Sequence, residues 1–154
     1  MKNRNVYFFF IAVSLFIGAA ASLLTSGNMN IYSSVITPPL SPPSIVFPIV
    51  WTFLYLLLGI SAARIYIAND KKWNTSLTIW TLQLAVNFFW SLIFFNLQAF
   101  LFAFIWLILL WVLIVIMIFM FYQKDKIAAY LQIPYLIWVT FAGYLTLGIY
   151  LLNR

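Results

Sequence analysis

The side chains of this chain that could do chemistry are mostly aromatic rings, with a few amides and hydroxyls. The sequence contains seven tryptophans, nine tyrosines and 16 phenylalanines, but no cysteine and no histidine. Thiol and imidazole chemistry are therefore excluded, together with nearly all transition-metal sites. The two acidic residues, Asp70 and Asp125, lie in short charged segments outside the apolar runs. Acid–base hydrolysis and two-metal catalysis thus lack their groups, and we expect neither a metal nor a resident cofactor.

The groups that remain suit a flat, apolar ligand. Aromatic rings that stack offset or edge-on contribute about 0.5–1.5 kcal/mol per pair beyond simple burial. A pocket rich in aromatic side chains with few polar groups is the usual small-molecule site. The apolar runs offer no carboxylate or imidazole for a proton relay, which counts against a proton-coupled pump. The sequence therefore predicts a binding site for a lipophilic small molecule.

The stretch that must position these rings is Thr37–Tyr55, TPPLSPPSIVFPIVWTFLY, which carries five of the six prolines. Paired prolines cannot lie inside a helix, so we predict Pro38–Pro43 to be a stiff, extended connector of polyproline type. Pro48 suits the first turn of a helix, where its missing N–H has no partner. Trp51 and Tyr55 would then lie four residues apart on one helical face.

The composition places the chain in a membrane. Of 154 residues, 66% are hydrophobic and 6% are charged, whereas a soluble domain has about 25% charged residues. The net charge of +6 could indicate nucleic acid binding, but the basic residues cluster at span ends, so membrane topology explains them better. A signal peptide is the alternative for Val6–Leu24, because Ala19-Ala20-Ala21 resembles a cleavage site. We favour a span, since the run is long enough to cross a bilayer.

Five apolar runs lie roughly at residues 6–26, 48–68, 75–97, 100–122 and 127–152, and a proline-rich loop at 27–47 separates the first two. We expect one domain over residues 1–154, an all-α membrane protein built as a five-transmembrane-helix bundle. Pro134 should kink the fifth span or start its regular part. The fourth span reads as lipid-facing filler, because it is nearly uniform in Leu, Ile, Phe and Trp.

Small residues recur every four positions in the first span, at Ser14, Gly18, Ser22 and Ser26. Such a stripe allows a neighbouring helix to approach closely. Bundle packing is the favoured interpretation, and a notch that faces a ligand is the alternative.

The third span carries polar and aromatic residues on one helical face, at Trp80, Gln83, Asn87, Trp90 and Ser91. Amides cannot stay unsatisfied in hydrocarbon, so this face must point into the bundle. Hydrogen bonding between helices and a ligand site are both open at this point.

The positive-inside rule gives an orientation. With five spans, the termini lie on opposite sides, and the N-terminal side carries Lys2, Arg4, Lys71, Lys72, Lys124 and Lys126. The other side carries Arg154. We therefore expect a multi-pass protein of the cell membrane, with a cytoplasmic N-terminus and the proline-rich loop outside.

Three motifs together resemble the TspO/MBR family of tryptophan-rich sensory proteins and translocator proteins over nearly the whole chain. They are P-P-x-x-x-F-P-x-V-W from Pro42 to Trp51, Q-x-x-x-N-x-x-W-S-x-x-F-F from Gln83 to Phe95, and P-Y-x-x-W-x-x-F-A from Pro134 to Ala142. The chain departs from the family's common residues at Ile31, Thr37, Ile45 and Thr146.

The resemblance implies a five-helix bundle, usually a homodimer, that binds porphyrins and, in animal members, cholesterol and benzodiazepine-type or other drug-like ligands. It also implies light- and oxygen-dependent breakdown of protoporphyrin IX, as ligand or substrate, in some bacterial members. It would assign Trp51 and Trp138 to this reaction. It would place ligand contacts at Tyr32, Pro42, Phe47, Trp51, Asn87, Trp90, Ser91, Trp138 and Ala142. Passive transport of tetrapyrroles and non-catalytic ligand sensing are the alternative functions.

Overall fold

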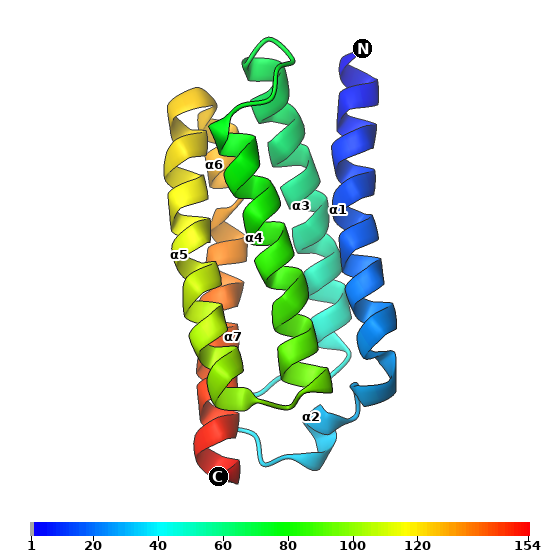
Figure 1. The fold of residues 1–154 in the computed structure, drawn as a ribbon, viewed down its shortest axis with the longest axis vertical. Helices are drawn as coiled ribbons and strands as arrows, with labels where there is room; N and C mark the ends of the chain where they lie inside the picture. The colour runs from blue at the N-terminus through cyan, green and yellow to red at the C-terminus, as the bar shows by residue number, and fades with distance from the viewer. Residues whose placement is uncertain (1) are drawn as a thin grey trace.

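The structure, a computed structural model, describes residues 2–154. Within that range five helices are long and apolar enough to cross a membrane, and Figure 1 shows them as one elongated bundle with the termini at opposite ends. The helices are α1 (Asn3–Thr25), α3 (Val46–Ala68), α4 (Thr75–Ser91), α5 (Phe100–Lys124) and α7 (Ile133–Asn153). The predicted fold class, an all-α bundle with five spans, is confirmed.

Short elements join the long helices. The 3₁₀ turn η1 (Ser26–Asn28) and the single turn α2 (Ile31–Ser34) lie in the proline-rich loop. Helix α4 continues into a π-helical turn, η2 (Leu92–Asn96), and α6 (Lys126–Tyr130) precedes α7. Pro134 occupies the first turn of α7, so it starts the regular part of the fifth span.

The connector between the proline pairs turns, which contradicts the prediction of a uniformly extended segment. Leu40 has a φ of 70°, in the left-handed region, and residues 39–40 form a turn. Leu40 lies between the two pairs and is not restrained by a following proline, so the chain can reverse there. The hydroxyl of Tyr144 donates to the Pro39 carbonyl at 2.6 Å, which fixes this turn against α7.

Two glycines allow α1 and α3 to pack closely. A Cβ added at Gly59 would lie 2.5 Å from the Cα of Ile11, and one added at Gly18 would lie 2.6 Å from Cδ2 of Tyr55. Neither position has room for a side chain, as expected of small residues between membrane helices. Bundle packing is thus one role of the small-residue stripe on α1.

Helix α5 exposes many large apolar side chains, as expected of a lipid-facing span, but it is also a structural wall of the bundle, so the description as filler is incomplete. It buries one stripe of side chains: Ala103, Leu107, Leu110, Leu113, Ile114, Met117 and Phe121. The indole N–H of Trp106 donates to the Val86 carbonyl of α4 at 2.7 Å, and that of Trp111 donates to Thr140 of α7 at 2.9 Å. Composition could not reveal the buried side because lipid and protein interior are equally apolar.

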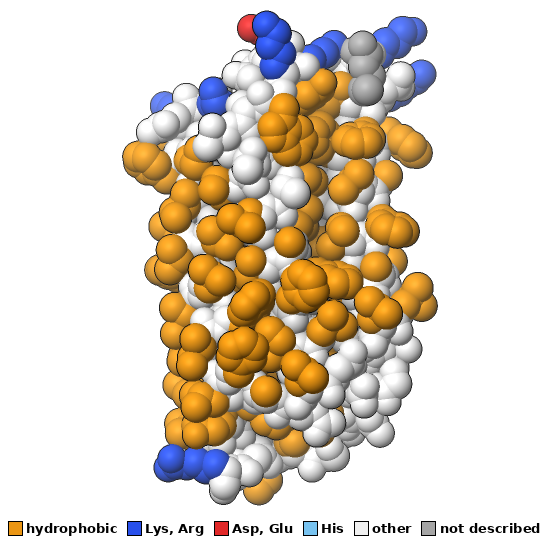
Figure 2. All heavy atoms as spheres, in the orientation of Figure 1, with side chains coloured by type: hydrophobic (Ala, Val, Ile, Leu, Met, Phe, Trp, Pro, Cys, Tyr) orange, Lys and Arg blue, Asp and Glu red, His pale blue; other side chains and the backbone are white. Residues whose placement is uncertain are grey.

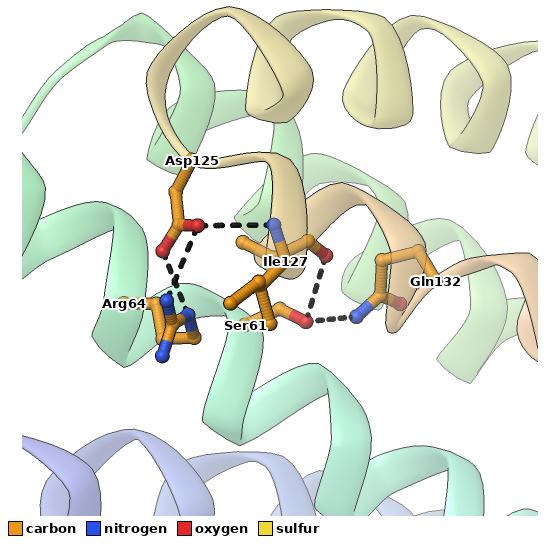
Figure 3. Close-up of polar contacts among 6 residues, drawn as sticks. Ser61, Arg64, Asp125, Ile127 and Gln132 are labelled. Carbon is orange, nitrogen blue, oxygen red and sulfur yellow. Dashed lines mark hydrogen bonds and ion pairs between the residues drawn. The ribbon is translucent and has the colours of Figure 1, made fainter.

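Charged side chains mark one end of the bundle. In Figure 2 most Lys and Arg side chains gather at the end that holds the N-terminus, hydrophobic side chains cover the flank in view, and one basic group lies at the opposite end. Arg64 of α3 pairs there with Asp125, with 2.7 Å between Nε and Oδ2 (Figure 3). Asp125 also accepts the backbone N–H of Ile127 at 3.0 Å, so it caps α6 as well as neutralising Arg64.

A second polar contact ties the break between α6 and α7 to α3 (Figure 3). The Ser61 hydroxyl donates to the Ala128 carbonyl at 3.1 Å, and the Gln132 amide donates to the Ser61 oxygen at 2.5 Å. Because Ser61 and Gln132 are fully buried, these bonds satisfy groups that lipid could not.

Candidate functional site

A cavity of about 410 Å³ occupies the half of the bundle nearest the proline-rich loop. Its walls come from α1, α3, the end of α4 with η2, and α7, and the loop contributes part of its rim. The volume falls in the range of roughly 300–1,000 Å³ that is typical of small-molecule sites. None of the described residues that line it carries a charge.

Trp51 is the centre of an aromatic cluster at this cavity. Its ring centroid lies 5.9 Å from that of Tyr55, 6.4 Å from Trp90, 6.3 Å from Tyr135 and 6.5 Å from Trp138. These separations are those of interacting aromatic pairs. Three helices, α3, α4 and α7, therefore converge on one indole.

Tyr32 of the proline-rich loop and Phe47 in the first turn of α3 add two more rings. Phe47 lies between Tyr32 and Trp138, with centroid distances of 5.0 Å and 5.7 Å. The hydroxyl of Tyr32 donates to the Pro42 carbonyl at 2.7 Å, so the second proline pair orients Tyr32. Pro42 itself does not line the cavity.

The residues predicted as ligand contacts divide into two groups. Six line the cavity: Tyr32, Phe47, Trp51, Trp90, Ser91 and Ala142. Three do not: Pro42, Asn87 and Trp138. Trp138 packs edge-on against Trp51 with an interplanar angle of 87°, which places it in the aromatic cluster without making it part of the cavity wall.

The polar face of α4 holds α7 in place. Tyr135 donates to Gln83 Oε1 at 2.6 Å, and the Asn87 amide donates to the Tyr135 oxygen at 3.1 Å. Gln83 in turn donates to the Trp80 carbonyl at 2.9 Å. The face points into the bundle as predicted, and of the two open interpretations, hydrogen bonding between helices describes Gln83 fully.

Three buried polar atoms near Trp51 have no hydrogen-bond partner in the described chain: Asn87 Oδ1, Trp90 Nε1 and Trp138 Nε1. A buried unsatisfied group costs about 1–3 kcal/mol, so such groups are rare and call for an explanation. Trp90 lines the cavity, but its unpaired N–H is itself buried, so the ring and not the N–H faces the space.

Sequence reasoning missed much of the wall formed by α1 and η2. Gly18 and Ser22 of the small-residue stripe line the cavity, so the stripe also provides the ligand-facing notch that was the alternative interpretation. Phe94 and Phe95 line it from the π-helical turn. The signal for these two was the F-F that closes the second motif, although nothing in the sequence indicated a π-helix, which is often found at functional sites.

The site can bind an apolar molecule by stacking on its aromatic rings. Helix α3 begins at Val46, and Ser44, Phe47 and Pro48 all contact the cavity. A helix N-terminus carries free N–H groups and a partial positive charge. Within residues 2–154 no three His, Cys, Asp or Glu side chains gather where they could hold a metal ion.

Five spans that surround an aromatic, uncharged cavity define the class of this protein as a helical-bundle membrane protein. Comparison with known proteins identifies its family: the TspO/MBR family profile matches residues 10–152. Tryptophan-rich protein TspO of Chlorobaculum tepidum is 35% identical over 146 residues, 93% of this chain and 92% of the relative. TspO of Archaeoglobus fulgidus is 39% identical over 148 residues, covering 93% and 94%. Protein CrtK of Rhodobacter capsulatus is 35% identical over 138 residues, covering 88% and 85%. The chain belongs to the TspO/MBR family, as the three motifs predicted.

Proposed function

We propose that this protein binds protoporphyrin IX, or a related drug-like or sterol-like lipophile, in the aromatic cavity and promotes light- and oxygen-dependent degradation of the porphyrin. The observation that carries the proposal is the cluster of rings around Trp51 beside an uncharged cavity. A porphyrin is flat, aromatic and mostly apolar, so stacking can hold it where no ion pair is offered.

The reaction requires an electron donor close to the excited porphyrin. The chain has no cysteine or histidine, so tryptophan and tyrosine rings are the groups suited to this step. Trp51 lines the cavity and Trp138 lies 6.5 Å from it, centroid to centroid. In this proposal an indole reduces the excited porphyrin by one electron, and the porphyrin radical anion passes that electron to dioxygen, which becomes superoxide. The oxidised indole regains its electron from the porphyrin, and superoxide adds to the resulting porphyrin radical cation, so that the net reaction adds dioxygen to the porphyrin. The propionates of the porphyrin lie near the N-terminus of α3.

Passive transport is the second candidate. It is favoured by the exposure of several cavity-lining residues of α1 and α3, among them Leu15 and Thr52. Non-catalytic sensing needs binding alone. Vesicles separate the three: transport moves porphyrin across the bilayer in the dark, degradation bleaches it only with light and oxygen, and sensing does neither.

The proposal also covers the oligomeric state of the protein and its orientation in the membrane. We propose a homodimer in the cell membrane with the N-terminus in the cytoplasm and the proline-rich loop outside. The orientation is supported by the basic residues at the N-terminal end of the bundle, because positive charge is retained on the cytoplasmic side. A protease added to sealed, right-side-out cells should cut at sites engineered into the loop and leave an N-terminal tag intact.

The decisive experiment is a titration of purified protein with protoporphyrin IX, followed by quenching of tryptophan fluorescence in the dark and then by porphyrin absorbance under light. Trp51→Phe and Trp138→Phe should each slow bleaching by about tenfold, a change of about 1.4 kcal/mol in barrier height, while the dissociation constant changes much less. If each substitution weakens binding as much as it slows bleaching, both indoles only shape the pocket and donate no electrons. Absence of saturable quenching would refute the proposed function.

A further inference from the structure

Helices α1 and α3 are in tight contact along only part of their length. Toward the charged end they meet at Gly59 and Ile11, and further toward the loop Gly18 meets Tyr55, where an added Cβ would lie 2.6 Å from the ring. From Leu15 to Thr25 of α1 and from Phe47 to Tyr55 of α3, both helices also contribute residues to the cavity wall. In the loop-side half of the bundle the two helices therefore border the cavity.

Five of the residues that α1 and α3 contribute to the cavity wall are also exposed. They are Leu15, Ala19 and Ser22 of α1 and Pro48 and Thr52 of α3. We call them the α1/α3 portal. Both helices are membrane spans, so an opening between them leads to lipid.

We propose that the cavity takes its ligand sideways from the loop-side half of the bilayer, through the α1/α3 portal. This inference rests on the proposed function in that the ligand is a lipophile. It adds that the ligand class consists of molecules already dissolved among the acyl chains, which enter with an apolar edge first.

The chemistry of the portal fits such a ligand. Its side chains are uncharged, and the hydroxyl of Thr52 donates to the Pro48 carbonyl at 2.7 Å. That hydrogen bond leaves the threonine methyl group to contact a passing molecule. A ligand crossing the portal therefore exchanges lipid contacts for protein contacts of the same kind and gives up no hydration shell.

Entry through the proline-rich loop would instead require hydrogen bonds to break. The Asn153 side chain of α7 makes two bonds with the backbone of Ile36, at 2.8 and 2.9 Å. Tyr144 holds Pro39 at 2.6 Å. Pro38 packs on Gly148 so closely that a Cβ there would lie 2.6 Å from it. The loop is fixed to α7 at several points, whereas no hydrogen bond between side chains of residues 2–154 joins α1 to α3 at the portal.

The proposal is tested by narrowing the portal. Ala19→Phe places a ring in it, and Ala12→Phe is the matched control: Ala12 is exposed, lies two turns away on nearly the same face of α1, and does not line the cavity. In lipid nanodiscs, stopped-flow quenching by protoporphyrin IX should show both rate constants, association and dissociation, lowered about tenfold by Ala19→Phe. The fall in the dissociation rate constant is the diagnostic result, because a ring that only displaced ligand from the cavity wall would raise that constant. Ala12→Phe should behave as the parent.

A loop variant distinguishes the two routes. Asn153→Ala removes two contacts that hold the loop to α7 and should leave both rate constants near those of the parent. If Asn153→Ala accelerates exchange and Ala19→Phe has no effect, the ligand enters through the loop and the portal proposal is overturned.

A measurement without porphyrin separates failure of the portal from failure of the proposed function. Lipids with brominated acyl chains quench tryptophans that they can reach, and two of the seven, Trp51 and Trp90, line the cavity. Ala19→Phe should protect part of the fluorescence, and Ala12→Phe should not. Protection without any porphyrin binding supports the portal and refutes the proposed ligand. Identical quenching in parent and both variants refutes the portal whatever the ligand proves to be.

Discussion

The two halves of this bundle use the same helices differently: one half is closely packed and the other surrounds a cavity. In the half at the charged end, α1 and α3 touch at Gly59, and Arg64 and Ser61 of α3 bond to Asp125 and to the α6–α7 break (Figure 3). In the loop-side half the helices separate around a cavity of about 410 Å³. The comparison indicates that close packing in one half supports a hollow, less stable half where a ligand can bind.

Gly18 marks the border between the halves. It touches Tyr55 closely and also lines the cavity. The stripe of small residues therefore changes role along a single helix, from packing surface to cavity wall.

Among the predictions that test the difference between the two halves, Gly59→Ala should have the largest effect on stability. The added Cβ would lie 2.5 Å from backbone of α1, which cannot move aside like a side chain, so α1 and α3 must separate in the packed half. We expect a loss of about 1–3 kcal/mol in unfolding free energy, the usual cost of overpacking, measured by thermal unfolding in detergent. Gly143→Ala is the control, because its Cβ would have no neighbour nearer than 3.5 Å. Equal stability of the two variants would show that the packed half tolerates separation.

The sequence predicted which side chains share the inner face of a helix, but not which of them line the cavity. Helical periodicity predicted that the polar face of α4 points into the bundle, and the structure brings Trp90 and Ser91 of that helix to the same cavity as Trp51 of α3. That residues of different helices meet at one site was implied by the family resemblance alone. Periodicity could not separate Trp138, which contacts the cluster, from Ala142, which lines the cavity, since both lie on the inner side of α7.

Other features depend on contacts between helices that cannot be read from a single sequence. The buried stripe of α5 could not be predicted because the whole helix is apolar. The turn at Leu40 depends on the hydrogen bond from Tyr144 to Pro39, two residues that lie more than a hundred positions apart in the chain. The contribution of α1 to the cavity depends on where α1 and α3 diverge.

In the hollow half, Ala142→Phe should weaken ligand binding with little effect on stability. Ala142 lines the cavity and is 6% exposed, so a ring placed there takes up room that a ligand would use. We expect the affinity for protoporphyrin IX to fall by about tenfold, or about 1.4 kcal/mol, in a fluorescence titration. Ala85→Phe, the same substitution at an exposed position of α4 that does not line the cavity, should bind as the parent does. Unchanged affinity in Ala142→Phe would place the ligand on another wall.

The smallest effect concerns the ion pair of the packed half. Asp125→Asn removes the charge opposite Arg64 but keeps an oxygen that can cap α6 at Ile127, since Asn and Asp are equally good caps. Arg64 is 31% exposed in its side chain and can extend to lipid phosphates, so the loss should be at most about 1 kcal/mol. Asp125→Ala also removes the cap and should cost about 1 kcal/mol more. Thermal unfolding with and without anionic lipid checks the reasoning, with the exposed Asp70→Asn as control. If anionic lipid restores nothing in Asp125→Asn while the loss far exceeds 1 kcal/mol, Arg64 is held inside the bundle, and the packed half depends on its charge pair as much as on its glycines.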